Sequence, residues 1–389
     1  MVRISLFIYV LFSSFGVMNI FFPLYLKSKG LDSGQIGNLY ALGAFVSIFA
    51  QPLWGFVSDK TKTIKRVLQM LIISSLLLSI GLFSVKTYVF ILLLYVGFML
   101  FYCSVGPLTE TLCLAYAYEN KKDFGKIRMW GEVGVGTSSI LLGVIVERIG
   151  IQSLWMVYAV IILLSIFASF WVRDTKASTT PVNFKALRKV MTQPKLLWFL
   201  FLILLLAIPN RMNDSMLGIY LSDLHATETQ LGFAWLVATL CTAVALLFVG
   251  NLLKKWNELV IFIFAGFMYV IRWVIYSQAD NPYVLVAAQA LHSLTFPLLL
   301  VASLQYILKI VPAELKATGQ AAFAVTFGGL GMIIGSSVGG HIFEQFGPQT
   351  AYGAGSVLAL IGTIAAVLTY VKERKSIVRR SHSPGTHIR

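Results

Sequence analysis

The composition of this 389-residue chain excludes a soluble enzyme and a protein that binds nucleic acid through a basic surface. Hydrophobic residues make up 58% of it and charged residues only 12%, with a mean hydropathy of +0.81, whereas soluble domains carry about 25% charged residues. The formal net charge of +15 is therefore expected in short loops between membrane spans, each of which needs roughly 20 apolar residues.

Twelve apolar segments follow one another along the chain, and each is long enough for a helix to cross a bilayer. The first is too long for a signal-peptide core of roughly 7–15 residues, so we expect it to be retained as a span. The sequence thus predicts an all-α polytopic membrane protein. The expected spans are 5–26, 36–57, 67–86, 89–112, 129–147, 152–172, 196–221, 231–250, 259–278, 283–308, 318–342 and 350–371.

A polar break at 173–195 divides the spans into two sets of six. It begins with a turn-rich stretch, and residues 184–190 follow as a predicted short basic amphipathic helix. We therefore expect four parts: an N-terminal six-helix bundle (1–172), a cytoplasmic central loop (173–195), a C-terminal six-helix bundle (196–371) and a basic tail (372–389). The tail is expected to be disordered from Lys375 onward.

The two halves match each other in sequence. A shift of 195 residues aligns 35–37 (Gln-Ile-Gly) with 230–232 (Gln-Leu-Gly), and a shift of 197 aligns 143–150 with 340–347 at both terminal glycines and the glutamate. These registers predict two six-helix repeats in parallel topology, which is the arrangement of six-plus-six transporters.

Basic residues fall almost entirely on one side of the predicted spans. With the N-terminus inside, cytoplasmic segments hold 25 lysines and arginines, and the opposite loops hold four. Because positive residues favour the cytoplasmic side, we expect a multi-pass protein of the inner or plasma membrane with both termini in the cytoplasm.

A few ionisable residues lie at membrane depth, where each costs about 3 kcal/mol on insertion scales and usually faces a polar cavity. Structural ion pairs between helices, or a helix end placed one turn too deep, are the alternatives. The three cysteines lie in apolar runs without metal-ligand spacing, so we expect small buried side chains, no metal and no cofactor. The ionisable residues are Arg128, Arg211, Arg272, Glu110, Glu132, Asp214 and His292.

The segment Gly55–Lys60 is expected in the loop between spans two and three. A glycine four residues before Asp59 permits close helix packing, and the carboxylate would be stabilised near the N-terminus of a neighbouring helix. An ordinary turn with a helix cap is an equally good interpretation of these residues alone.

The same residues resemble a known family. Residues 55–66 resemble the loop 2–3 motif of the major facilitator superfamily, and 33–37 and 51–60 resemble the lactose permease branch with its phenylpropionate-permease-like relatives. The likeness extends over nearly the whole chain. It implies the major facilitator fold and a role in conformational gating for Gly55, Asp59 and Lys60.

The resemblance also implies a substrate site. Residues 107–110 and 124–131 are similar to the segments that carry the sugar-binding glutamate and arginine of that branch, with the same spacing of eighteen. Arg272 and His292 resemble positions of its proton and substrate network. The implied substrate-binding residues are Asn19, Glu110, Arg128, Arg272 and His292.

Four departures from that branch argue against a galactoside. Val135 replaces a stacking tryptophan, and neutral residues replace three charged ones at Thr239, Gln289 and Thr295, the last at the position of the proton-carrying glutamate. If a proton is coupled, another carboxylate must take it. We rank Glu132 first because it lies one turn from Arg128, Asp214 second and Glu110 third.

These features predict a secondary active transporter, which we expect to work as a monomer with a small-molecule substrate, protons and the bilayer as its partners. Arg128 and Arg272 suit a carboxylate or polyol hydroxyls, and Trp130, Trp235 and Trp273 are candidates either for ring stacking or for packing. Proton symport of a sugar, nucleoside or aromatic acid is the first hypothesis, and proton-antiport efflux is the alternative. No HExxH motif occurs in the sequence, and we expect no enzyme.

Overall fold

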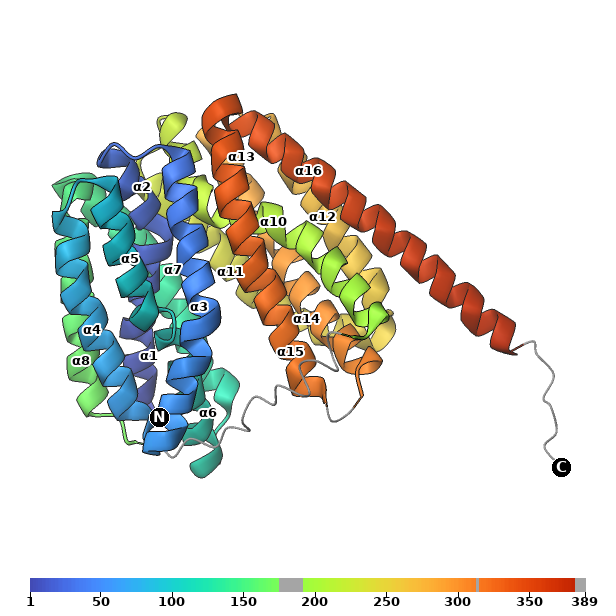
Figure 1. The fold of residues 1–389 in the computed structure, drawn as a ribbon, viewed down its shortest axis with the longest axis horizontal. Helices are drawn as coiled ribbons and strands as arrows, with labels where there is room; N and C mark the ends of the chain where they lie inside the picture. The colour runs from blue at the N-terminus through green and yellow to red at the C-terminus, as the bar shows by residue number, and fades with distance from the viewer. Residues whose placement is uncertain (175–191, 313–314, 382–389) are drawn as a thin grey trace.

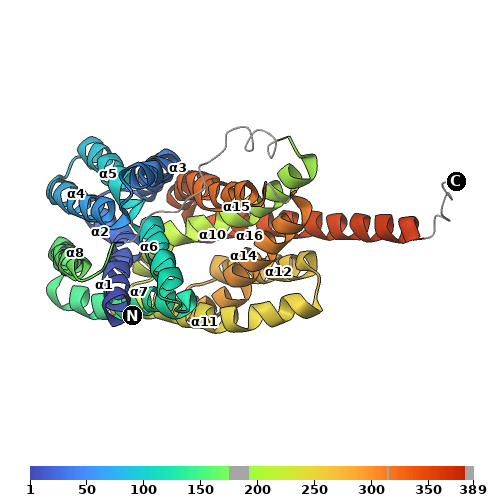
Figure 2. The same cartoon turned by 90° about the horizontal axis from the view of Figure 1, so that it is seen from below.

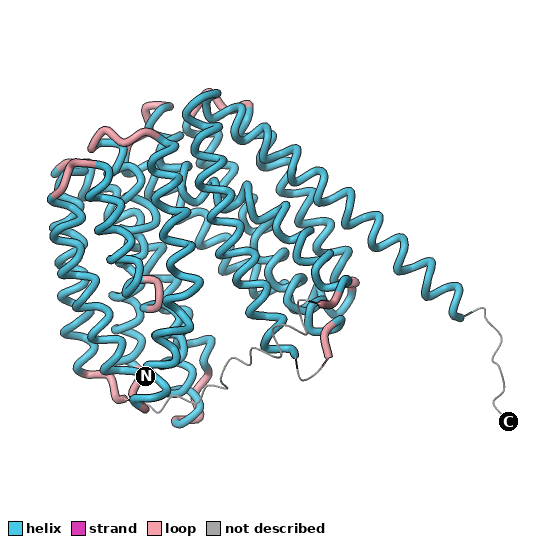
Figure 3. Tube along the Cα trace, in the orientation of Figure 1, coloured by secondary structure: helices cyan, strands magenta, loops and turns pink. Residues whose placement is uncertain are grey.

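A computed structural model describes residues 1–174, 192–312 and 315–381. Within these ranges the chain consists of helices joined by short loops, and it contains no strand (Figure 3). This is the expected result for a chain in a bilayer, because a helix satisfies its backbone hydrogen bonds within one segment. The predicted basic helix at 184–190 lies outside the described residues.

The first six spans occupy one side of the molecule (Figures 1 and 2). Short breaks divide the first, fourth and sixth of them into two or three helical pieces. Span one is α1 (Val2–Phe15), the π-helical η1 (Gly16–Phe21) and α2 (Phe22–Ser28); then come α3 (Ser33–Thr61), α4 (Ile64–Ser84), α5 (Tyr88–Tyr102) with α6 (Val105–Glu119), α7 (Phe124–Ile149), and η2 (Ile151–Ser153) with α8 (Leu154–Phe170).

The last six spans lie beside them. Span seven is α10 (Pro194–Asp223), followed by α11 (Glu228–Lys255), α12 (Glu258–Ser277), α13 (Pro282–Ala288) with η3 (Gln289–Leu291) and α14 (His292–Ile310), and then α15 (Lys316–Ala324) with the π-helical η5 (Val325–Leu330) and α16 (Gly331–Ser381). The helix α16 contains the end of span eleven and all of span twelve.

The predicted number of twelve spans is confirmed. Eleven apolar helical stretches in the described residues are long enough to cross a membrane, and the last of them, Thr318–Lys375, contains two spans. The chain turns between these two at Gly347, whose φ of 84° suits glycine, and Pro348 follows. The kink therefore stands where a loop was expected.

The repeat register has a local structural basis. Asp32 accepts a hydrogen bond from the Gln35 backbone N–H and receives the Gln35 side chain at its own N–H, which makes a capping box at the start of α3. Thr227 and Gln230 form the same capping box at the start of α11. The glutamines that align at a shift of 195 residues thus begin equivalent helices.

Glycines bring the two halves into backbone contact at one end of the molecule. A side chain at Gly37 of α3 would overlap the carbonyl oxygen of Ser336 in α16, and one at Gly232 of α11 would overlap that of Ser139 in α7. We call this end, formed by 27–38, 139–149, 223–232 and 336–346, the closed end. It lies at the top of Figure 1, opposite the N-terminus.

Polar contacts also join the halves at the closed end. Glu344 accepts a hydrogen bond from the Ser33 N–H at 2.9 Å, and Glu147 accepts one from the Thr229 N–H at 3.1 Å. These are equivalent contacts in the two repeats, since each glutamate reaches the first turn of a helix in the other half. Lys27 forms an ion pair with Asp223 nearby.

Two predicted boundaries were wrong. Gly55, Asp59 and Lys60 do not lie in a loop, because α3 continues to Thr61 and ends only where Lys62 takes a left-handed φ of 54°. A side chain at Gly55 would meet nothing within 4 Å, so this glycine makes no close helix contact here. The tail is helical through Ser381 rather than disordered from Lys375, since no glycine or proline interrupts it before Pro384.

Candidate functional site

A cavity of about 530 Å³ lies between the two halves and draws side chains from both. It adjoins a second cavity of about 450 Å³ with which it shares Phe15, Asn19, Tyr40 and Met332. The second cavity reaches Gln51, which follows Tyr40 along α3 away from the closed end. The polar residues lining the first cavity are Asn19, Tyr40, Glu110, Glu132, Asn210, Arg211, Asp214, Trp235 and His292.

The wall from the N-terminal half centres on one guanidinium shared by two carboxylates. Arg128 Nε donates to Glu110 Oε1 at 2.8 Å, and Arg128 Nη1 lies 3.0 Å from Glu132 Oε1. The arginine stands 4.9 Å from the Phe12 ring. Both carboxylates line the cavity while Arg128 lies behind them, so this wall has a net charge of −1.

Local helix geometry produces that arrangement. Arg128 and Glu132 are four residues apart on α7 and therefore share one helix face. Glu110 comes from α6, which begins at Val105 after a short break that follows α5. Gly131 keeps the space beside Arg128 open, since a side chain there would lie 3.0 Å from the Phe12 ring and 3.2 Å from the arginine.

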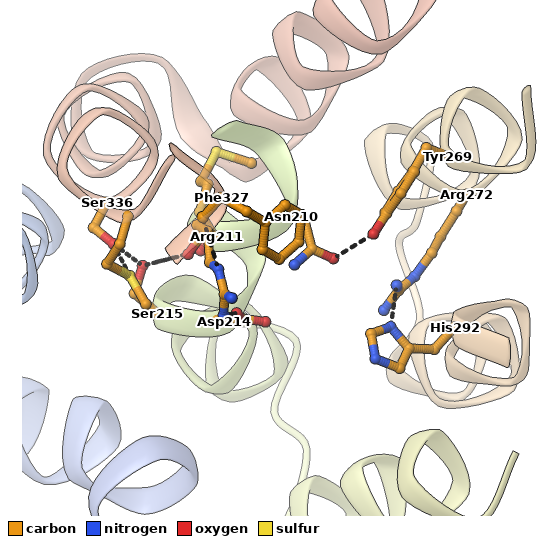
Figure 4. A network of polar contacts seen from close by, with 11 residues as sticks. Asn210, Arg211, Asp214, Ser215, Tyr269, Arg272, His292, Phe327 and Ser336 are labelled. Atoms are coloured by element: carbon orange, nitrogen blue, oxygen red, sulfur yellow. Dashed lines mark hydrogen bonds and ion pairs between the residues drawn. The ribbon is translucent and has the colours of Figure 1, made fainter. Parts of the chain in front are cut away.

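The wall from the C-terminal half presents a second ion pair (Figure 4). Arg211 Nη1 donates to Asp214 Oδ2 at 2.8 Å, three residues further along α10. Arg211 Nε donates to the Phe327 carbonyl at 3.3 Å, within the π-helical turn η5, where the backbone departs from regular α-helical pairing. The guanidinium also stands 4.6 Å from the Phe327 ring.

Arg272 is buried behind this wall, with only 1% of its surface exposed. Among the described residues no carboxylate lies within 4.0 Å of it. Its Nη2 donates to Gln289 Oε1, its Nη1 lies 2.9 Å from His292 Nδ1, and the rings of Trp273 and Tyr276 stand 4.8 and 5.5 Å from it. Acceptors and aromatic faces thus stabilise the charge in place of an anion.

The structure brings most of the predicted site residues together. Asn19, Glu110, Glu132, Asp214 and His292 all line the cavity. Arg128 and Arg272 do not line it, but each contacts a residue that does, Glu110 and His292 respectively. The segment Gly55–Lys60 lies near the end of α3, outside the cavity lining.

The aromatic candidates separate into three environments. Trp235 lines the cavity, Trp273 is fully buried below Arg272, and Trp130 is 40% exposed on the outer surface. Val135 also lines the cavity, at the position where the resemblance expects a stacking tryptophan. Of the three tryptophans, therefore, only Trp235 is placed to stack on a solute.

Three polar lining residues were absent from the predicted site, namely Tyr40, Asn210 and Arg211. Arg211 is a charged residue inside predicted span seven, and Asn210 precedes it in the same span. Asn210 is 2% exposed, and its Oδ1 accepts a hydrogen bond from the Tyr269 hydroxyl at 3.1 Å. The Pro209-Asn210-Arg211 run in an apolar helix was the available signal, since polar residues beside a proline mark irregular backbone in membrane helices.

Comparisons with known proteins agree with one another. A model of the MFS_1 like family matches residues 1–354. The chain is 24% identical to an uncharacterized transporter, YwbF, of Bacillus subtilis (86% of this chain and 84% of that one), and 23% identical to the maltose permease of Geobacillus stearothermophilus (95% and 94%). It is 24% identical to a probable 3-phenylpropionic acid transporter of Escherichia coli (92% and 94%).

Solved structures show the same fold. The nucleoside transporter NupG superposes with a TM-score of 0.84 at 14% identity, covering 95% of this chain and 98% of that one. A bacterial homolog of the human lysosomal transporter Spinster, in an inward-facing and unoccupied conformation, superposes with a TM-score of 0.71 at 13% identity, covering 99% and 98%.

Proposed function

Because the chain belongs to the MFS_1 like family of transporters, we propose that it carries a small organic solute together with protons by alternating access to the central cavity. The observation that carries this proposal is the cavity itself. It lies between two repeat-related halves, brings three carboxylates to membrane depth, and is separated from one face by the glycine contacts of the closed end. Rocking of the halves 1–172 and 196–371 would expose it to the other face.

The charge pattern supports an orientation for this cycle. With 25 basic residues on the side of the termini and four on the other, both termini belong in the cytoplasm and the closed end faces outward. The conformation is then inward-facing. We propose the cell membrane as the location and a monomer as the working unit.

Glu132 is the preferred proton carrier. Arg128 is shared by two carboxylates, so protonation of one leaves a neutral pair with the other. The Glu110 contact is a hydrogen bond at 2.8 Å, whereas Arg128 Nη1 makes no hydrogen bond of good geometry although it lies 3.0 Å from Glu132. Protonation of Glu132 therefore sacrifices a weaker interaction with Arg128 than protonation of Glu110 would. Asp214 is the second choice because Arg211 forms an ion pair with no other carboxylate among the described residues. A proton on Asp214 would therefore leave this arginine without an anionic partner.

The substrate would contact Asn19, Glu110 and His292 directly, with Arg128 and Arg272 holding Glu110 and His292 in place. Gly55, Asp59 and Lys60 would act in the other conformation, in which the ends of the helices opposite the closed end approach one another.

Uptake into proteoliposomes tests this function. Purified protein would be given maltose, uridine and 3-phenylpropionate, the solute classes named for its relatives, under an imposed gradient that is acidic outside. We expect at least one solute to accumulate above its external concentration and a protonophore to abolish the accumulation. Accumulation only when the gradient is reversed would indicate antiport, and loss of the gradient without solute selectivity would indicate a channel.

A further inference from the structure

We infer that the cavity binds a polyhydroxylated carboxylic acid of the sugar-acid class, with its carboxylate against Asn210, Arg211 and His292 and its hydroxyls against Glu110 and Glu132. This inference rests on the proposed function, since it names the class of solute that the transport site takes. The evidence for it is that the two walls of the cavity differ in formal charge and in their hydrogen-bond donors and acceptors.

The formal charges of the walls are opposite. The wall from the N-terminal half has two carboxylates and one guanidinium, whereas the C-terminal side has two guanidinium groups, Arg211 and Arg272, and one carboxylate, Asp214. The first is therefore negative and the second positive, by one charge each. This difference favours a solute whose acceptor or anionic end faces the C-terminal half.

His292 is fixed as a hydrogen-bond donor to the cavity. A guanidinium has no acceptor, so the 2.9 Å contact between Arg272 Nη1 and His292 Nδ1 requires a lone pair on Nδ1. The imidazole is then neutral and carries its proton on Nε2, on the side of the ring away from Arg272 (Figure 4). Among the described residues Nε2 has no partner, and His292 lines the cavity.

Two more donors lie on the same wall. The Oδ1 of Asn210 is used by Tyr269 at 3.1 Å, which leaves the amide NH₂ for the cavity. Arg211 uses Nε and Nη1 within the protein and has Nη2 without a partner among the described residues. Three N–H groups from α10 and α14 thus suit a carboxylate, which accepts several charge-assisted hydrogen bonds at once.

The opposite wall presents acceptors. Glu110 and Glu132 have side chains 45% and 43% exposed, and each uses only one oxygen on Arg128. The other oxygens suit hydroxyl donors. A proton on Glu132 would neutralise this wall, so that an acid entering with a proton leaves the cavity charge unchanged. An amine has no such compensation.

A neutral sugar satisfies only half of this site, because it leaves the donors of the C-terminal wall without an anion. Sites that hydrogen-bond a specific group reject analogues that lack it, since buried polar groups then go unpaired. The cavity volume of about 530 Å³ is within the range for small-molecule sites.

Matched ligand sets test the inference directly. Thermal unfolding of the purified full-length protein would be measured with glucose, glucuronate and glucosamine, with galactose, galacturonate and galactosamine, and with the methyl glycosides of glucose and glucuronate. We expect at least one acid to raise Tm and to bind at least tenfold more tightly than its neutral and amino counterparts. Equal or tighter binding of those counterparts, or no stabilisation by any acid, would overturn the inference.

Variants of His292 then separate its two contacts. His292→Asn keeps an acceptor near Nδ1 for Arg272 but removes the cavity donor, and we expect acid affinity to fall at least tenfold. His292→Gln places an amide near Nε2 and should restore most of the affinity. Lys309→Gln is the matched control, since it removes a cation that pairs with Glu258 outside the cavity. Equal affinity in the Asn and Gln variants would contradict the assignment of the donor.

The binding and uptake experiments together distinguish failure of this inference from failure of the proposed transport function. Protonophore-sensitive accumulation of maltose or uridine, with no binding of any acid, would contradict the inference but support the proposed transport function. Selective acid binding without accumulation of any solute would support the binding specificity but contradict the proposed transport function.

Discussion

At the scale of single residues, we propose that the shared guanidinium of Arg128 determines which carboxylate binds the proton. Its two carboxylate partners compete for one positive charge. We therefore expect the ion pair with the poorer geometry, Arg128–Glu132, to break first when a proton binds. A site of this kind can bind a proton without leaving an arginine unpaired, which would be costly in a low-dielectric cavity.

We therefore predict that Glu132→Gln separates solute exchange from proton coupling. Accumulation driven by a pH gradient should fall at least tenfold, while counterflow exchange, which needs no net proton movement, should stay within about threefold of wild type. Both rates can be measured in the same proteoliposomes with labelled solute. Glu258→Gln, in an ion pair outside the cavity, is the control. Full accumulation by Glu132→Gln would make Asp214 the next candidate.

Sequence reasoning named most of the polar residues that line the cavity, but not how their helices are rotated toward it. The resemblance assigned Glu110 and Arg128 to one substrate site, and the structure shows a hydrogen bond of 2.8 Å between them. That the arginine lies behind its carboxylates, and that Arg211 faces the cavity, depend on how α7 and α10 are rotated by packing against their neighbours. A helical pattern that is apolar on nearly all sides does not specify this rotation.

At the scale of helices, the glycines of the closed end set how closely the halves approach. Gly37→Ala should lower Tm, because its new methyl group would overlap the Ser336 carbonyl and force α3 away from α16, an overpacking that costs about 1–3 kcal/mol. Gly55→Ala is the matched control in the same helix. It meets nothing within 4 Å and gains helix propensity of roughly 0.5–1 kcal/mol.

Comparing thermal unfolding of these two variants also tests the role proposed for Gly55. A normal Tm with impaired uptake in Gly55→Ala would support its action in the other conformation. Equal Tm values for the Gly37 and Gly55 variants would contradict the close contact at the closed end.

The glutamates at the closed end lead to another prediction. Glu147 and Glu344 each place a carboxylate at the first turn of a helix in the opposite half, where the helix dipole favours a negative charge. Glu147→Gln and Glu344→Gln should each open this end about two- to fivefold more often, and together by roughly the product. The readout is the labelling rate of a cysteine at Met332 by an impermeant maleimide applied from that side, with the native cysteines replaced. An unchanged rate in the double variant would contradict the prediction.

The helices themselves were largely predictable, since apolar length and turn residues marked all twelve. The errors share one cause. Charged residues at 59–60 and 372–375 were interpreted as loop and tail, yet lysine, arginine and glutamate are good helix formers and no glycine or proline stopped α3 or α16 there. Polarity indicates where a helix leaves the bilayer, not where it ends.

At the scale of the whole molecule, the uneven distribution of the basic residues predicts that both termini lie in the cytoplasm. Fusions of alkaline phosphatase, which is active only outside the cytoplasm, should be inactive after Ser381 and active in the loop 278–281. The opposite pattern would reverse the membrane orientation and make the observed conformation outward-facing.

The central claim is that one solute crosses with at least one proton through the cavity between the halves. The most direct measurement is the internal pH of proteoliposomes, reported by a trapped dye, when a transported solute is added outside at zero membrane potential. The account predicts that the lumen acidifies with wild-type protein and not with Glu132→Gln. Solute entry into wild-type vesicles without any change of internal pH would contradict it.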